Sequence, residues 1–307
     1  MADVLVADDS FDRTVFKGAS CAFGVFDGVH RGHRFLIDAA CKTAYQSGGT
    51  SVVITFDRDP DELFRRAFLK KLMTNNQRID MLASLPIDYV VVLPFTPEFA
   101  AESPEAFLRS AFRGTPPAFL HVGCDFRFGA KAAGTVDDLC AWANAGVTHI
   151  CPHDLKSADG LPISATRIRG LLAEGRVFEA NALLGRPYLM SGSVLHGRGE
   201  GADMGFATAN LFVDPLLQAI GDGVYAAWVT VGGVRYRAAV SVGVAPMFAH
   251  SATATCEVHI LDFAGNLYGH VIDIEFMEWL RPMMTFPSTD ALIACVKGNI
   301  DWVRANL

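Results

Sequence analysis

A glycine-rich segment near the N-terminus carries two histidines three residues apart. It reads Gly24-Val25-Phe26-Asp27-Gly28-Val29-His30-Arg31-Gly32-His33. Its glycines let backbone N–H groups approach an anion closely, and both imidazoles can face one phosphate chain beside the positive end of a helix. Such groups favour charge that develops on a phosphoryl group in a transition state. A structural turn with two surface histidines is the simpler alternative, and a metal pair is a weaker one because no third ligand lies at zinc-site spacing.

The elements that must position this segment are a strand and a helix. Apolar Cys21-Ala22-Phe23 ends the first expected strand, and residues 34–47 repeat apolar side chains at helical spacing. The alternation continues, with strands expected at 50–56, 87–94, 118–123 and 148–151 and helices at 77–84, 104–112, 136–145 and 167–174. This order predicts an α/β doubly wound, Rossmann-like parallel sheet that binds ligands at the carboxyl ends of its strands.

The pattern changes after Gly185 and Pro187, where a helix ends. Short strands separated by glycine turns are expected at 188–195, 224–231, 234–242, 256–261 and 271–276, and an amphipathic helix at 288–305. Antiparallel strands at this spacing predict a small closed β-barrel with a C-terminal helix. We therefore expect two domains, residues 1–186 and residues 187–307.

Two loops of the first domain follow expected strands. Asp57-Arg58-Asp59-Pro60 follows the strand at 50–56, and it fits an ordinary turn as well as a functional one. After the strand at 118–123, Phe126 and Phe128 alternate with Asp125 and Arg127. Aromatic faces interleaved with charged groups could hold a flat ring and its phosphate, although core phenylalanines are the alternative.

A third segment opens the last helix of this domain. It reads Ile163-Ser164-Ala165-Thr166-Arg167-Ile168-Arg169. Ser164 or Thr166 is placed to cap the helix, which would explain both residues structurally. Arg169 lies one turn into the helix, where its cation could meet phosphate groups.

The second domain contains a glycine-rich loop and a candidate base. Residues 196–210 include Gly197, Gly199, Gly201 and Gly205. Their backbone could wrap a polyphosphate, and a glycine-rich hairpin loop is the alternative. Thr208 and Asn210 supply oxygen ligands of the kind that Mg²⁺ shares with nucleotide phosphates. Glu257 alternates with apolar neighbours along its expected strand, as an ordinary outward-facing carboxylate would.

Composition excludes several classes of protein. The 307 residues are 51% hydrophobic, yet no apolar run is long enough to cross a bilayer. The N-terminus lacks a signal-peptide pattern, so we expect a cytoplasmic protein. Seven cysteines without a Cys-x-x-Cys pair indicate reduced thiols. A net charge of −7 without a basic run argues against nucleic acid and membrane partners, and the oligomeric state stays open.

Five blocks, in order, resemble the bacterial bifunctional riboflavin kinase/FAD synthetase family. The first domain offers the blocks at 24–33, 122–129 and 163–169, which are similar to the two nucleotidyltransferase signatures and the flavin-binding loop between them. The second domain offers Gly-Phe-Ala-Thr-Ala-Asn at 205–210 and Glu-Val-His-Ile-Leu-Asp-Phe at 257–263, which resemble riboflavin kinase signatures. The resemblance implies ATP-dependent phosphorylation of riboflavin to FMN, then adenylylation of FMN to FAD with release of pyrophosphate.

The resemblance also implies roles for individual residues. The catalytic set would be His30, His33 and Arg169 for adenylylation and Glu257, as general base, for phosphorylation. ATP would be bound by Gly24, Phe26, Asp27, Gly32, Ser164 and Thr166 in one domain and by Gly197, Gly199 and Gly205 in the other. Flavin would contact Asp125, Phe126, Phe128 and Arg281. Magnesium would be held by Thr208 and Asn210, and the partners would be the small molecules riboflavin, FMN and ATP.

Some positions depart from the family pattern. Val25, Asp59 and Ala165 replace an Asn, a His and a Ser usual in the transferase, while Ala207 and Met247 replace a Pro and a Thr usual in the kinase. Two alternatives therefore stay open: a monofunctional FMN adenylyltransferase whose barrel only binds flavin, and a non-catalytic flavin sensor. A transferase for another acceptor, such as phosphopantetheine, is disfavoured by the attached barrel.

Overall fold

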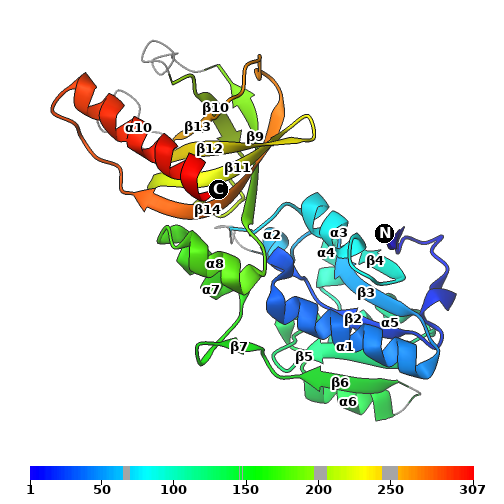
Figure 1. The fold of residues 1–307 in the computed structure, drawn as a ribbon. Coiled ribbons are helices and arrows are strands. Elements are labelled where there is room, and N and C mark those ends of the chain that lie inside the picture. Colours follow the sequence, from blue (N-terminus) through cyan, green and yellow to red (C-terminus); the bar gives the residue numbers. More distant parts are fainter. Residues whose placement is uncertain (65–69, 145, 147, 197–205, 244–254) are drawn as a thin grey trace. The chain divides into compact units, whose positions relative to one another are not determined.

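The structure, a computed structural model, describes residues 1–64, 70–144, 146, 148–196, 206–243 and 255–307 (Figure 1). Contacts group the chain into two compact units, Met1–Ala165 and Thr166–Leu307. This division falls at the start of helix α7 (Ala165–Ala173). The boundary expected from the sequence lies after the next helix, α8 (Val177–Leu184).

The first unit is built on a six-stranded sheet. Its strands are β1 (Asp3–Val6), β2 (Ser20–Phe23), β3 (Ser51–Phe56), β4 (Tyr89–Leu93), β5 (Phe119–Gly123) and β6 (His149–His153). The order is β1-β4-β3-β2-β5-β6 and every neighbouring pair is parallel. From β2 the chain proceeds to one side through β3 and β4, and then returns to the other side at β5. The carboxyl ends of β2 and β5 therefore form the topological switch point where such sheets bind ligands.

Helices cover both faces of this sheet, as the sequence predicts (Figure 1). They are α1 (Arg31–Ser47), α2 (Asp61–Phe64), α3 (Asn75–Ala83), α4 (Pro97–Ala100), α5 (Pro104–Phe112) and α6 (Val136–Asn144). Three 3₁₀ turns, η1 (Arg13–Phe16), η2 (Asp27–Val29) and η3 (Ala130–Ala132), and a small hairpin of β7 (Ser157–Ala158) and β8 (Leu161–Pro162) complete the unit. Several of these helices begin at residues whose side chains cap the helix, such as Thr74 and Gln77, which form a capping box at α3.

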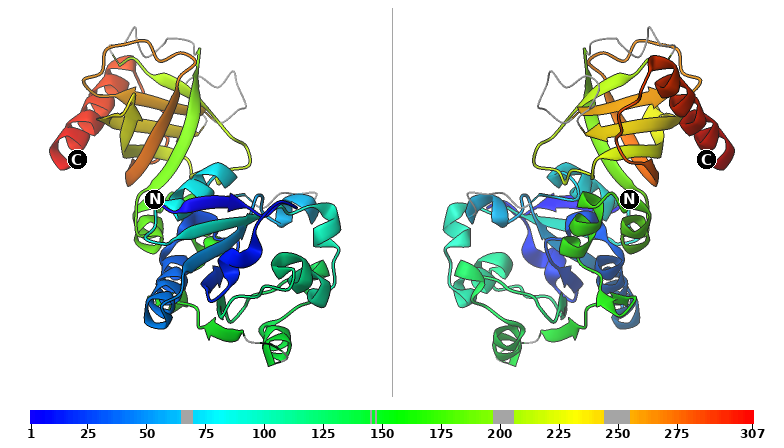
Figure 2. Two further views of the ribbon diagram at one scale, coloured as in Figure 1. Left: turned by 90° about the vertical axis from the view of Figure 1, so that its right-hand side faces the viewer. Right: turned by 90° about the vertical axis from the view of Figure 1, so that its left-hand side faces the viewer.

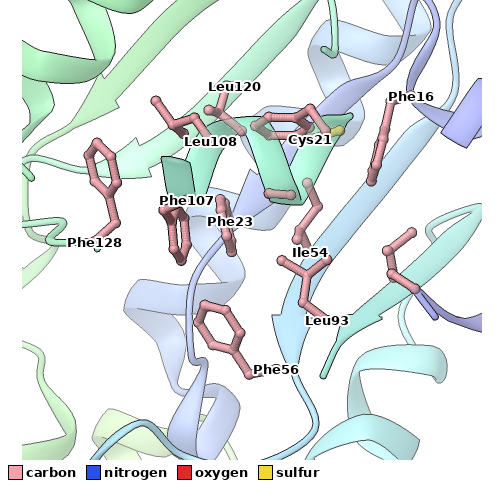
Figure 3. Packing of buried hydrophobic residues seen from close by; sticks show 14 of the residues in the cluster. Phe16, Cys21, Phe23, Ile54, Phe56, Leu93, Phe107, Leu108, Leu120 and Phe128 are labelled. Carbon is pink, nitrogen blue, oxygen red and sulfur yellow. The ribbon is translucent and has the colours of Figure 1, made fainter. Parts of the chain in front are cut away.

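Two apolar cores lie on opposite faces of the sheet, because successive strand residues point to opposite sides. Along β3, Ile54 and Phe56 join the core with α5 and α6, whereas Val53 joins the core with α1 and α3. Figure 3 shows the first core, in which Phe23 stacks on Phe107 with centroids 6.0 Å apart. The central strands β2, β3 and β4 are buried on both faces, so their sequences read as continuous apolar runs.

The second unit contains a closed antiparallel barrel. Its strands are β9 (Tyr188–Leu195), β10 (Ala209–Val213), β11 (Gly223–Val231), β12 (Val234–Gly243), β13 (Thr255–Ile260) and β14 (Val271–Arg281). They close in the order β10-β13-β12-β11-β14-β9. Helix α10 (Thr289–Asn306) lies along the outside of the barrel (Figure 2), where Ile300 and Val303 pack with Ala226 and Leu261.

Helices α7 and α8 pack on this barrel, which explains why contacts group them with it. The backbone N–H of Gly221 donates to the Leu172 carbonyl at 2.8 Å. A Cβ at Gly221 would lie 2.7 Å from the Ala173 carbonyl oxygen, so only glycine permits this approach. From α8, the Asn181 amide donates to the Phe276 carbonyl at 2.8 Å and accepts from the Tyr188 N–H at 2.7 Å.

The structure corrects several element boundaries expected from the sequence. The strand ending at Phe23 is the second, because β1 adds to the sheet edge beside β4. Strand β10 is additional to the strands expected from the sequence, and the predicted metal ligand Asn210 lies on it. Strand β14 extends to Arg281, five residues beyond Phe276.

All seven cysteines are free. Within the ranges that the structure describes, no helix has both the length and the apolarity to cross a membrane.

Candidate active sites

The glycine-rich segment forms a sharp turn at the carboxyl end of β2. The Gly24 N–H donates to the Ile54 carbonyl at 3.1 Å, which extends the pairing of β2 with β3. Phe26, Gly28 and Val29 then have positive φ values of 60°, 77° and 38°. Left-handed conformations of the non-glycine residues Phe26 and Val29 are strained by about 1–3 kcal/mol each. The surrounding contacts must therefore hold this turn in place.

The turn delivers His30 and His33 to the first turn of α1, which begins at Arg31 rather than at residue 34. His30 caps the helix, because its Nδ1 accepts from the His33 N–H at 3.2 Å. In the neutral ring the proton must then be on Nε2. The two imidazoles stack with centroids 3.5 Å apart and an interplanar angle of 18°, and Phe26 packs edge-on against His33 at 5.3 Å. The structure thus brings both predicted histidines together beside the positive end of α1.

Gly32 lets the first signature block meet the second. A Cβ on Gly32 would lie 3.1 Å from Cε1 of His30 and 3.3 Å from the Ile163 carbonyl oxygen. Ser164 follows Ile163 and immediately precedes α7, as expected for a capping position. Thr166 and Arg169 lie on α7, within the second compact unit, and Arg169 is 9% exposed.

Asp27 has a structural partner in addition to the ATP role expected for it. Both of its carboxylate oxygens accept from the Leu72 N–H, at 3.0 and 3.1 Å, and the residue is buried. Asp59 is half-buried in the loop after β3, where its carboxylate accepts from the Asp61 N–H at 2.9 Å. Burial raises the pKa of Asp59, and the neighbouring Asp27 and Asp61 add to the rise.

The loop after β5 contains the predicted flavin contacts in different surroundings. Phe128 is 4% exposed and packs against Phe107, with centroids 5.5 Å apart, so it belongs to the core. Phe126 is half-buried and lies 5.3 Å from Phe23. Asp125 is exposed, and its carboxylate would lie 2.8 Å from a Cβ on Gly123. Of the flavin contacts predicted in this loop, Asp125 and Phe126 are therefore the ones that remain accessible at the switch point.

A pair of histidines that sequence reasoning missed joins β5 to β6. His121 is 2% exposed, and its Nδ1 lies 2.8 Å from Nε2 of His153, so one proton is shared between these nitrogens. Burial, with a smaller contribution from His153, lowers the pKa of His121 to about 4. Burial also lowers the pKa of His153, against the attraction of Asp154. Both rings are therefore neutral at pH 7.

This pair makes the stability of the protein depend on pH. The unfolded chain binds protons at these rings below about pH 6.5, whereas folded His121 resists protonation down to about pH 4. We expect stability to fall as the pH drops through this window, by at most about 3 kcal/mol from His121. Urea unfolding from pH 7.5 to 4 should show a shallower decline for His121→Leu. The exposed His149→Leu serves as control, and equal slopes for His121→Leu and wild type would contradict the prediction.

The barrel places Glu257 between two polar partners. Asn210 on β10 and Ser241 on β12 are both directly opposite Glu257 on β13. Side chains directly opposite one another share a face, with Cβ atoms about 5 Å apart. Ser241 is in turn opposite Val224, which is opposite Arg281 on β14. One cross-strand row therefore contains the predicted base, a predicted metal ligand and a predicted flavin contact.

His259 on β13 contacts the segment that leads into β10. Its Nδ1 lies 2.9 Å from the Ala207 carbonyl oxygen, and its ring meets Phe206 edge-on at 5.9 Å. Thr208, between this contact and Asn210, is exposed. The predicted ATP contacts Gly197, Gly199 and Gly205, and the departure at Met247, lie outside the described residues.

Each half of the chain matches a known protein family. The FAD synthetase family model matches residues 12–167, and the riboflavin kinase family model matches residues 184–307. Three relatives are named bifunctional riboflavin kinase/FMN adenylyltransferase. The one from Listeria monocytogenes is 35% identical and aligns over 92% of this chain and 91% of its own length. Those from Pseudomonas fluorescens and Escherichia coli K12 are 32% and 33% identical, covering 95% and 91% of this chain and 94% and 89% of their own.

A solved structure has the same overall fold. It is titled a macrolide-efflux protein from Streptococcus pneumoniae, is 26% identical, and aligns over 99% of each chain with a TM-score of 0.82. The two-domain α/β and barrel architecture derived above therefore occurs as a unit in another protein.

Proposed function

Since this chain belongs to the bifunctional riboflavin kinase/FMN adenylyltransferase family, and so makes FMN from riboflavin and FAD from FMN, we propose that residues 1–186 carry the adenylyltransferase and residues 187–307 the kinase. The two matched regions, 12–167 and 184–307, support this division. Helix α7 is assigned to the first domain because the signature block at 163–169 includes its start, although α7 and α8 pack on the barrel.

The adenylyltransferase site is proposed at the switch point around His30 and His33. A phosphate oxygen of FMN attacks the α-phosphorus of ATP, and the bond from that phosphorus to the bridging oxygen breaks as pyrophosphate leaves with the electron pair. The attacking phosphate is already ionised, so no general base is needed. The stacked imidazoles and the start of α1 supply positive charge to the reacting phosphates. The resemblance of the block at 163–169 to the family signature assigns the same role to Arg169. The stacked pair is the observation that carries this assignment.

Binding residues follow from the same turn. Gly24, Phe26 and Gly32 shape the backbone against ATP, and Asp27 does so through its bond to the Leu72 N–H. Ser164 and Thr166 offer hydroxyl donors at the start of α7. Asp125 and Phe126 face the flavin, whereas Phe128 supports Phe126 from the core.

The kinase site is proposed on the row Asn210, Glu257 and Ser241. Glu257 removes the proton from the terminal ribityl hydroxyl as that oxygen attacks the γ-phosphorus of ATP, and ADP leaves. Asn210 and Ser241 lie directly opposite Glu257 on the two neighbouring strands. Arg281, on the same row, contacts the flavin. The glycine loop that contains Gly197, Gly199 and Gly205 is proposed to bind ATP.

Magnesium is proposed to bind at Thr208 and Asn210. Their side-chain oxygens match the hard oxygen ligands that Mg²⁺ prefers, and Asn210 is directly opposite Glu257. Among the described residues, no group of three or more His, Cys, Asp or Glu side chains could hold a metal. An ion shared with the ATP phosphates would neutralise charge on the transferred group.

The partners are proposed to be riboflavin, FMN and ATP, in the cytoplasm. The net charge of −7, without a basic run in the sequence, supports small-molecule partners over nucleic acid or a membrane surface.

Chromatography of the flavins formed from ATP tests the assignment. Purified protein with Mg²⁺ should give FAD from riboflavin in one tube and from FMN in another. EDTA should stop both reactions, and excess Mg²⁺ should restore them. FAD from FMN alone would indicate that Ala207 and Met247 have cost the barrel its kinase step. Bound flavin without turnover in either tube would identify a sensor.

A further inference from the structure

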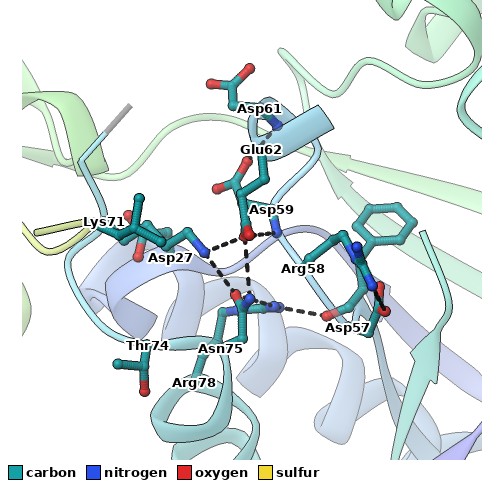
Figure 4. Close-up of polar contacts among 12 residues, drawn as sticks. Asp27, Asp57, Arg58, Asp59, Asp61, Glu62, Lys71, Thr74, Asn75 and Arg78 are labelled. Carbon is teal, nitrogen blue, oxygen red and sulfur yellow. Dashed lines mark hydrogen bonds and ion pairs between the residues drawn. The ribbon is translucent and has the colours of Figure 1, made fainter. Parts of the chain in front are cut away.

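We propose that Arg78 is a positioning residue of the adenylyltransferase, which fixes the turn carrying His30 and His33 relative to the loop after β3. The proposal rests on the role assigned above to that turn. Arg78 lies on α3 and does not belong to any of the signature blocks. Figure 4 shows it beneath the acidic loop, surrounded by polar groups.

The Arg78 guanidinium bonds to the backbone of both loops. Its Nη1 donates to the Val25 carbonyl at 2.9 Å and to the Thr55 hydroxyl, and its Nη2 donates to the Phe56 carbonyl at 2.8 Å. The Thr55 hydroxyl also donates to the Val25 carbonyl at 3.2 Å. Val25 lies within the strained turn, while Thr55 and Phe56 end β3. One planar cation therefore sets the separation of the two loops.

A second bond from the same part of the chain holds the turn at its other side. The Leu72 N–H donates to both carboxylate oxygens of Asp27, two residues after Val25. Between these two anchored positions lies Phe26 with φ 60°, and Val29 with φ 38° follows. Residues in this conformation persist only where the surroundings over-determine them. Without Arg78, we expect the turn to relax and to shift the start of α1.

Charge explains why a cation can be buried here. Arg78 is 2% exposed, and burial lowers its pKa, whereas the carboxylates of Asp59, Asp27, Glu62 and Asp57 act in the opposite direction. Asp27 belongs to the turn, whereas Asp57, Asp59 and Glu62 belong to the loop after β3 and to helix α2 that follows it (Figure 4). A buried cation without carboxylates nearby would destabilise the fold. The four carboxylates therefore offset the cost of burying the charge of Arg78.

Asn75 and Lys71 extend this network to the acidic loop. The Asn75 side-chain oxygen accepts from Lys71 at 3.3 Å and from Arg78 at 3.4 Å, and its amide nitrogen donates to Glu62 at 3.2 Å. Glu62 also pairs with Lys71 and accepts from the Asp59 N–H at 2.9 Å. Asp59, where the family usually has a histidine, is therefore held by the same network. Movement at Arg78 would therefore reach both the turn that carries His30 and His33 and the loop after β3.

Kinetics of Arg78 variants test the proposal. Arg78→Lys keeps the charge but cannot donate in a plane to three acceptors, and Arg78→Met removes both. Misplacement by about 1 Å can cost roughly 100-fold in rate. We expect kcat for FAD formation from FMN to fall roughly 100-fold in Arg78→Met and roughly tenfold in Arg78→Lys, with smaller changes in KM. FMN formation by the same samples should be unchanged.

Controls separate positioning from folding. Arg113→Met removes a cation from an exposed pair with Asp9 and should leave both activities unchanged. A merely structural role for Arg78 would lower the unfolding midpoint while kcat per folded molecule stayed at the wild-type value. An Arg78→Met enzyme that is folded by near-ultraviolet circular dichroism and keeps kcat within twofold would overturn the proposal.

Two further variants keep the outcome decisive. If Arg78→Met fails to fold, Thr55→Val tests the same geometry, because it removes only the hydroxyl between Arg78 and Val25. An unchanged kcat in folded Thr55→Val would then refute the proposal, and a loss of roughly threefold or more would support it. His33→Ala in the same series checks the premise. If His33→Ala keeps full activity, the site assignment is wrong; if only the Arg78 and Thr55 variants keep it, the positioning role is wrong.

Discussion

Replacing His33 by alanine is expected to lower FAD formation from FMN by orders of magnitude while FMN formation from riboflavin continues. The imidazole stacks on His30 at the N-terminus of α1, where the α-phosphate is proposed to react. Removing one preorganised donor from such a site costs roughly 100- to 1,000-fold in kcat. The measurement is the initial rate of each flavin product, resolved by chromatography, with riboflavin or FMN as substrate.

A second histidine provides the matched control. His149 is exposed on β6, so His149→Ala should leave both rates unchanged. Equal loss of FAD and FMN formation in His33→Ala would indicate misfolding instead. A full rate of FAD formation in a folded His33→Ala enzyme would remove the histidine pair from catalysis.

The second large effect is expected from Glu257→Gln, which should stop phosphorylation of riboflavin and spare adenylylation of FMN. The amide keeps the shape of the side chain between Asn210 and Ser241 but cannot accept a proton. General base catalysis contributes roughly 100- to 10,000-fold, so FMN formation should fall by that order. Initial rates of ADP and FMN production give the result directly.

The barrel offers an isosteric control for this variant. Glu275 on β14 pairs with Arg235 and is opposite neither Asn210 nor Ser241, so Glu275→Gln should keep the kinase rate. A kinase rate in Glu257→Gln equal to that of the control would exclude Glu257 as the base. Loss of FAD formation from FMN in the same variant would indicate damage beyond the kinase step.

Much of the fold could be predicted because most of its strands are recognisable in the sequence. Strands buried on both faces, such as β3 and β4, read as short apolar runs bounded by polar loops. Strand β1 was missed because its residues are mostly exposed at the sheet edge, so only Val4-Leu5-Val6 marks it. Strand β10 is hard to recognise in the sequence because it is short and directly follows the glycine-rich loop, and because the polar Asn210 lies among its apolar residues.

Some features of the candidate sites could likewise be predicted from the sequence, and others could not. The proximity of His30 and His33 follows from their spacing at a helix start, which sequence alone gives. The pairing of Asn210 with Glu257 does not, because strand register is decided by the whole barrel. Arg78 was also unpredictable, since a single cation in an amphipathic helix normally faces solvent. Only the tertiary structure brings it to the carbonyl of Val25.

The left-handed backbone at Phe26 and Val29 has a consequence for protein engineering. Val29 is fully buried in the apolar core that includes Leu36 and Ile37 of α1. Glycine or asparagine at position 29 would relieve the backbone strain, but glycine would leave a cavity and asparagine would bury a polar amide. Selection for heat resistance is therefore expected to leave this turn unchanged and to act elsewhere in the chain, so that thermostabilised descendants would keep the balance between FMN and FAD.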